Sequence, residues 1–95
     1  MAWDDKVKSF FQIIANQLGC QVRLTNAGAI FSYNGKEIYF SYFMNSKPNN
    51  TVKIVYNKDY KPGKAPKSVE VGNYTFDQLD LQNSRNEVKV KILEV

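Results

Sequence analysis

The stretch AIFSYNGKEIYFSYFM, residues 29–44, decides the fold of this chain. Two runs of aromatic and β-branched residues flank Asn34 and Gly35, and both of these residues tolerate the positive φ angles that a two-residue hairpin turn requires. The stretch therefore predicts an antiparallel hairpin. The turn also sets the register, with predicted pairs Tyr33–Lys36, Ser32–Glu37, Phe31–Ile38, Ile30–Tyr39 and Ala29–Phe40. One face of the hairpin is strongly apolar, so we expect a helix to cover it.

A helix is expected over residues 4–18, ahead of the hairpin. Asp4 and Asp5 favour its start, by capping and by meeting the positive end of the helix dipole, and Gly19 favours its end. The apolar side chains recur at the spacing of one buried stripe, which consists of Val7, Phe10, Phe11, Ile14 and Leu18.

Further strands are expected on both sides of the hairpin, at residues 20–25, 52–56, 68–71 and 87–95. The last is indicated by apolar residues that alternate with Lys89 and Lys91. Residues 72–73 (GN) suggest a bulge or tight turn, and residues 75–78 (TFDQ) have the capping-box pattern of a short helical turn. The predicted fold class is α+β: one N-terminal helix packed on an antiparallel meander of five or six strands, in a single domain, residues 1–95.

The composition limits the class of protein. With 43% hydrophobic and 14% aromatic residues among 95, the chain can bury enough surface to fold. Its one cysteine, Cys20, excludes an internal disulfide, so we expect a cytoplasmic protein and interpret Cys20 as a small buried hydrophobe. No apolar run approaches the roughly 20 residues that span a bilayer, and no segment resembles a signal peptide. We expect a complete small protein without membrane contact.

Several catalytic chemistries are excluded by the residues present. The chain has no histidine, which removes the commonest general base and transition-metal ligand, and no glycine-rich phosphate loop. One alternative is a magnesium site formed by Asp77, Asp80, Glu87 and Lys89, because metal-dependent nucleases combine paired carboxylates with Glu-x-Lys. Glu-x-Lys is a common tripeptide, however, and a solvated strand edge explains it here. We therefore predict a non-enzymatic protein with no cofactor and no metal.

A lysine-rich segment, NKDYKPGKAPK at residues 57–67, holds most of the excess charge. Its four lysines and one aspartate give 4 − 1 = +3 of the chain's net +4. A polyproline II helix has about three residues per turn and would align the lysines along one edge, facing a phosphate backbone or an acidic protein surface. The simpler interpretation is a solvated connector between two strands. The candidate binding residues in this segment are Lys58, Tyr60, Lys61, Lys64 and Lys67.

The second face of the hairpin carries Ile30, Tyr39 and Phe43 and is the other candidate surface. Aromatic side chains on a sheet stack unpaired bases in single-strand binders, and they are also enriched at protein interfaces. The simpler interpretation is that C-terminal strands cover this face and create a two-sided core. A free strand edge is a third candidate, since it can pair with a partner's strand or with a second copy in a homodimer.

We predict a small binding protein that acts through protein–protein interaction, as an inhibitor or adaptor. The prediction follows from the missing catalytic chemistry and from an aromatic-rich body that is nearly neutral outside the loop. The abundance of lysine and asparagine in so short a chain suggests a phage or mobile-element protein that blocks a host enzyme. The alternative is a nucleic-acid-binding module that uses loop 57–67 and the sheet aromatics. Of the thirteen basic residues, however, only Arg23 and Arg85 are arginines, the preferred side chain for reading bases and phosphates.

Overall fold

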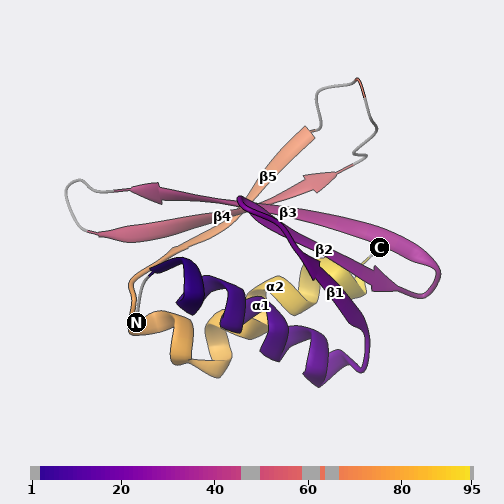
Figure 1. The fold of residues 1–95 in the computed structure, drawn as a ribbon, viewed down its shortest axis with the longest axis horizontal. Coiled ribbons are helices and arrows are strands. Elements are labelled where there is room, and N and C mark those ends of the chain that lie inside the picture. The colour runs from indigo at the N-terminus through magenta and orange to yellow at the C-terminus, as the bar shows by residue number, and fades with distance from the viewer. Residues whose placement is uncertain (1–2, 46–49, 59–62, 64–66, 95) are drawn as a thin grey trace.

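The computed structural model describes residues 3–45, 50–58, 63 and 67–94 (Figure 1). Its elements are α1 (Trp3–Leu18), β1 (Gln21–Leu24), β2 (Gly28–Tyr33), β3 (Lys36–Asn45), β4 (Thr51–Lys58), β5 (Lys67–Tyr74), the 3₁₀ turn η1 (Gln78–Asp80) and α2 (Gln82–Leu93). The five strands form one antiparallel meander in the order β1-β2-β3-β4-β5. Both helices lie side by side on the same face of this sheet (Figure 1). The predicted α+β class and the antiparallel meander are confirmed.

The first helix forms where the apolar stripe predicted it. It ends at Gly19, whose φ of 67° lies in the left-handed region that favours glycine. The backbone N–H of Cys20 donates to the carbonyl of Ala15 at 3.0 Å and closes the last turn. Leu18 is half-buried. The other stripe residues are buried against the sheet, namely Val7, Phe10, Phe11 and Ile14.

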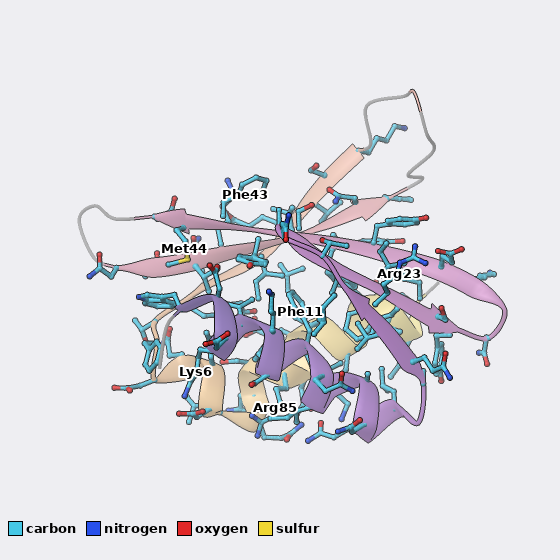
Figure 2. All side chains as sticks on the ribbon, in the orientation of Figure 1. Lys6, Phe11, Arg23, Phe43, Met44 and Arg85 are labelled. Atoms are coloured by element: carbon cyan, nitrogen blue, oxygen red, sulfur yellow. The ribbon has the colours of Figure 1, made fainter. Side chains whose placement is uncertain are left out.

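The β2–β3 hairpin has the register that the Asn-Gly turn predicted, and all five predicted pairs are confirmed. Asn34 and Gly35 adopt φ angles of 52° and 75°, as a type I′ turn requires. On the helix-facing side, the rings of Phe31 and Phe40 meet edge to face at 5.5 Å. Phe11 of α1 packs against both rings and lies between the helices and the sheet (Figure 2). An aromatic cluster thus joins α1 to the middle of the sheet.

Gly28 brings β2 unusually close to β3. A Cβ atom at this position would lie 2.0 Å from the backbone oxygen of Phe40. The turn before it is held by two hydrogen bonds: the N–H of Thr25 donates to the carbonyl of Gly28 at 3.0 Å, and the N–H of Tyr42 to that of Ala27 at 2.9 Å. Because the obstructing atom belongs to the backbone, only glycine fits here without separating the strands.

A register shift interrupts the pairing of β4 with β5. Val55 pairs with Glu70, whereas Ile54 pairs with Gly72, so Val71 is an extra residue in β5. The sequence indicated a bulge or turn beginning at Gly72, and the shift lies directly beside it. The bulge divides β5 into two short paired segments.

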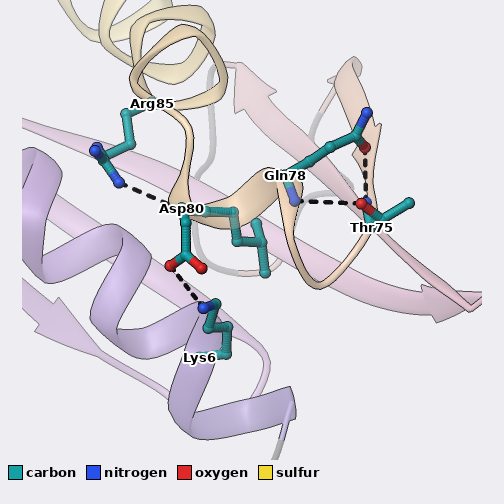
Figure 3. Close-up of polar contacts among 6 residues, drawn as sticks. Lys6, Thr75, Gln78, Asp80 and Arg85 are labelled. Carbon is teal, nitrogen blue, oxygen red and sulfur yellow. Dashed lines mark hydrogen bonds and ion pairs between the residues drawn. The ribbon is translucent and has the colours of Figure 1, made fainter.

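The segment after β5 forms the short helical turn that its capping-box pattern predicted (Figure 3). The backbone N–H of Thr75 donates to Gln78 Oε1 at 2.8 Å, and the backbone N–H of Gln78 donates to Thr75 Oγ1 at 3.2 Å. Lys6 of α1 forms an ion pair with Asp80 at 2.6 Å. Arg85 of α2 donates to a backbone carbonyl of the same turn at 3.5 Å. The turn is therefore tied to both helices.

The C-terminal segment is a helix, so the final strand predicted over residues 87–95 is wrong. Val88 and Ile92 are fully buried, whereas Val90 is 48% exposed, which is the pattern of a helix. Helix and strand periods share the i, i+4 positions, and for this reason the sequence fitted both. Tertiary packing favours the helix over the strand. α2 packs beside α1 and contacts β5, where it completes the core on the helix-bearing face.

Candidate functional site

The strand register divides the sheet residues between two faces, and no described element covers one of them. Ile30, Tyr39 and Phe43 share this open face, as the hairpin register predicted. Phe43 points away from the helices and is 53% exposed (Figure 2), whereas Ile30 and Tyr39 are half-buried. The expectation that C-terminal strands cover this face is wrong, because α2 packs on the other face.

A polar cluster borders Tyr39 on the open face. The hydroxyl of Tyr39 donates to Glu37 Oε2 at 3.3 Å, and Arg23 Nη2 lies 3.7 Å from the same oxygen. Because both charged side chains are largely exposed, the ion pair contributes about 1 kcal/mol or less to the stability of the fold. Arg23, Ile30 and Tyr39 are direct neighbours across β1, β2 and β3, so the cluster and the apolar residues form one continuous surface.

A chain of hydrogen bonds crosses β5, β4 and β3 on the same face. Ser68 Oγ donates to Asn57 Oδ1 at 3.1 Å, and Asn57 Nδ2 donates to Ser41 Oγ at 2.7 Å. Beside this chain, a hollow of about 200 Å³ opens next to Gly28 and Tyr39. Small-molecule sites usually enclose about 300–1,000 Å³. The hollow therefore suits one side chain of a partner better than a whole ligand.

The charges on the open face cancel. Its described positions carry two basic residues, Arg23 and Lys53, and two acidic residues, Glu37 and Glu70. Phe43 lies directly opposite Lys53 on the neighbouring strand. A balanced surface of this kind exerts little long-range attraction on a polyanion.

The two described lysines of the basic loop lie together at the far end of β4 and β5. Lys58 ends β4, Lys67 begins β5, and these exposed residues are direct cross-strand partners. Their register positions belong to the helix-bearing face, opposite to the face of Tyr39 and Phe43. These two lysines and the aromatic side chains of the open face therefore do not share one surface. The other candidates of this loop lie outside the described residues, namely Tyr60, Lys61 and Lys64.

The residues considered for a magnesium site are separated in the fold. Asp80 is paired with Lys6, and Lys89 Nζ donates to Gln17 Oε1 at 3.0 Å. Glu87 and Lys89 lie on α2, where side chains two residues apart point in different directions, so the strand context expected for Glu-x-Lys is wrong. Within the described ranges, no three histidine, cysteine or acidic side chains gather as metal ligands.

Three of the described side chains have a raised pKa: Tyr42, where burial and after it the Asp4 carboxylate are the causes, Tyr74 and Cys20. The hydroxyl of Tyr74 is buried and has no hydrogen-bond partner among the described residues. Burial, and after it the nearby carboxylate of Glu87, raises the pKa of Tyr74 well above its usual range. Burial likewise raises the pKa of the Cys20 thiol. None of these three groups is thus poised to ionise at neutral pH.

Two features of the open face were not predicted: the hydrogen-bond chain through Asn57 and the hollow beside Gly28. Each had a signal in the sequence. Asparagine is disfavoured inside strands, and Asn57 lies in a run rich in β-branched residues. A glycine in a strand often marks a close backbone approach. Neither signal indicates by itself which face is involved.

No protein-family model, curated protein or solved structure matches the chain. Of the helices in the part of the chain that the structure describes, none has the length and hydropathy to cross a membrane. The function is therefore inferred from the geometry of the open face and the strand edges.

Proposed function

We propose that this chain is a small, non-enzymatic binding protein that holds a protein partner on the open face of its sheet. One observation carries the proposal: both helices cover one face (Figure 1), and the opposite face presents Phe43, more than half exposed, four residues along β3 from Tyr39. A solvated face of an antiparallel sheet is usually polar. Exposed aromatic side chains are typical anchors of protein interfaces, and Tyr39 on the same face lines the hollow of single-side-chain size.

A protein partner is favoured over nucleic acid by the distribution of charge. Single-strand binders combine stacking aromatics with a positive groove on the same surface. Here the described positions of the open face are balanced in charge, and Lys58 and Lys67 belong to the other face. The polar groups of the open face, including Ser41 and Asn57, suit the mixed hydrogen bonding of a protein rim.

The proposed role is that of an inhibitor or adaptor, which acts by occupying a surface of its partner. This role requires no catalytic group. We include a cytoplasmic setting in the proposal, because a chain with the single cysteine Cys20 folds without disulfides. A phage or mobile-element origin, with a host enzyme as the blocked partner, is the setting that the composition suggests.

Affinity purification from the native cell, with and without nuclease treatment, tests the proposal. Phe43→Ala is the informative variant, and Met44→Ala is its matched control, because Met44 is the next residue of β3, is 44% exposed and lies on the opposite face. We expect a nuclease-resistant protein partner whose recovery falls by about tenfold or more with Phe43→Ala and is unchanged with Met44→Ala. Equal recovery with both variants, or recovery that nuclease abolishes, would contradict the proposal.

A further inference from the structure

The outer edge of β5 is a second surface with unsatisfied groups. β5 is the last strand of the sheet, and the backbone hydrogen bonds outside the strand pairs and helices involve none of its residues, Lys67–Tyr74. About half of the backbone N–H and C=O groups of an edge strand point away from its neighbour. On β5 these outward groups have no partner among the described residues. The run from Lys67 to Glu70 is exposed at every position, and it ends at the bulge at Val71.

Two lysines lie where β4 ends and β5 begins, and no acidic residue among those that the structure describes pairs with them. Lys58 and Lys67 face each other across β4 and β5, and neither forms an ion pair with a described residue. Like charges directly opposite each other destabilise a sheet. The acidic residue of β5, Glu70, lies on the open face and accepts a hydrogen bond from Asn73 at 3.4 Å. It therefore does not offset the lysines.

We propose that the β5 edge binds an extended acidic segment of a protein, which adds a strand to the sheet and places carboxylates beside Lys67 of β5, with Lys58 one strand further in on β4. The edge offers both donors and acceptors, and an extended polypeptide satisfies both, whereas a phosphate backbone supplies acceptors only. Side chains alternate between faces along a strand. Acids at every second position of the segment would thus all lie on the lysine face, away from Glu70.

A second copy of this chain fits the edge less well. The residues of β5 on the lysine face are not acidic, so a paired copy would leave the lysines uncompensated. They are Lys67, Val69, Gly72 and Tyr74. The bulge at Val71 also shortens the run over which two identical edges could pair.

The binding of short peptides that alternate glutamate and valine, followed by fluorescence anisotropy at low salt, tests the proposal. Three forms are compared: one unmodified, one N-methylated at every glutamate and one N-methylated at every valine. All N–H groups on one side of a strand belong to alternate residues, so only one methylated form removes the donors that face β5. We expect the unmodified peptide and one methylated form to bind similarly, and the other methylated form to bind at least about tenfold more weakly.

Protein variants separate the charge contribution from the backbone contribution. Lys67→Gln should weaken binding by up to about fivefold, the upper range for one exposed ion pair. Lys36→Gln is the matched control, because Lys36 is also an exposed lysine at the start of a strand, and this change should leave binding unchanged. Phe43→Ala should also leave it unchanged, so failure of the edge proposal is distinguishable from failure of the open-face proposal.

Several outcomes would overturn the edge proposal. Absence of binding by the unmodified peptide at low salt would exclude it, as would equal binding by both methylated forms. If the Lys67→Gln variant binds the unmodified peptide as tightly as the parent protein does, the lysine charge does not contribute to binding. A single-stranded oligonucleotide that binds more tightly than the unmodified peptide would indicate that the lysines bind nucleic acid instead. A dimer of the free chain that the peptide dissociates would assign the edge to a second copy.

Discussion

Replacing Gly28 with alanine tests the close approach of β2 to β3. The added Cβ would stand 2.0 Å from the backbone oxygen of Phe40, 3.0 Å from its carbonyl carbon and 3.1 Å from Ser41 Cα. All three atoms belong to the backbone of β3, which is paired on both sides, so no side-chain rotation relieves the clash. The strands must separate by about 1 Å, which stretches their hydrogen bonds beyond the normal range.

The expected loss follows from these contacts. Overpacking of a well-packed site costs about 1–3 kcal/mol. The hydrogen bond from the N–H of Tyr42 to the carbonyl of Ala27 lies in the same turn and contributes about 1 kcal/mol more. We therefore expect Gly28→Ala to lower the free energy of unfolding by about 2–4 kcal/mol. That is a large fraction of the about 5–15 kcal/mol of a typical small domain.

Urea denaturation followed by far-UV circular dichroism measures this loss, with Gly35→Ala as the control. Gly35 has a φ of 75° and nothing within 4 Å of its added Cβ, so the control bears only the strain of left-handed backbone, about 1–2 kcal/mol. A loss for Gly28→Ala no larger than that for Gly35→Ala would refute the close approach of the strands.

Two further predictions concern the C-terminal helix and the buried tyrosine. Val88→Ala should lower the free energy of unfolding by about 1.5–3 kcal/mol, whereas Val90→Ala, at a position 48% exposed, should change it by less than about 0.5 kcal/mol. A strand would place both side chains on one face, so similar losses would contradict the helix. Folding raises the pKa of Tyr74, so with rising pH the hydroxyl loses its proton in the unfolded chain before it does so in the folded chain. The stabilisation is therefore fully present below about pH 10. Above that pH the free energy of unfolding falls by up to about 1.4 kcal/mol per pH unit. Urea denaturation between about pH 9 and pH 11 should show a shallower decline for Tyr74→Phe, and an equal decline would contradict the raised pKa.

Much of the fold was predictable because its signals are local. The Asn34–Gly35 turn determines the register of the strands beside it, and a stripe at helical spacing is sufficient to place α1. The capping box between Thr75 and Gln78 likewise acts within four residues. The C-terminal segment differs, because its apolar residues fit two periods and the choice depends on which part of the sheet α1 leaves uncovered.

The candidate site was predictable only in part. Hairpin geometry was enough to place Ile30 and Tyr39 on the same face, but local sequence does not determine whether that face is covered. The face taken by Lys58 and Lys67 depends on the register of β4 with β5, and a shift of one residue would reverse it. Their connecting segment lacks a two-residue turn signal that would set this register from sequence.

The position of α2 explains why the open face exists. If the C-terminal segment had formed strands over the second face, Phe43 would lie in a two-sided core and its role would be packing. Instead α2 joins α1 on one face, and the buried apolar residues of the chain are gathered almost entirely on that side. On the open face, Ser41 and Asn57 satisfy each other by hydrogen bonding and need no cover. Phe43, more than half exposed, contributes little to the core, and for this reason we propose a binding role for it.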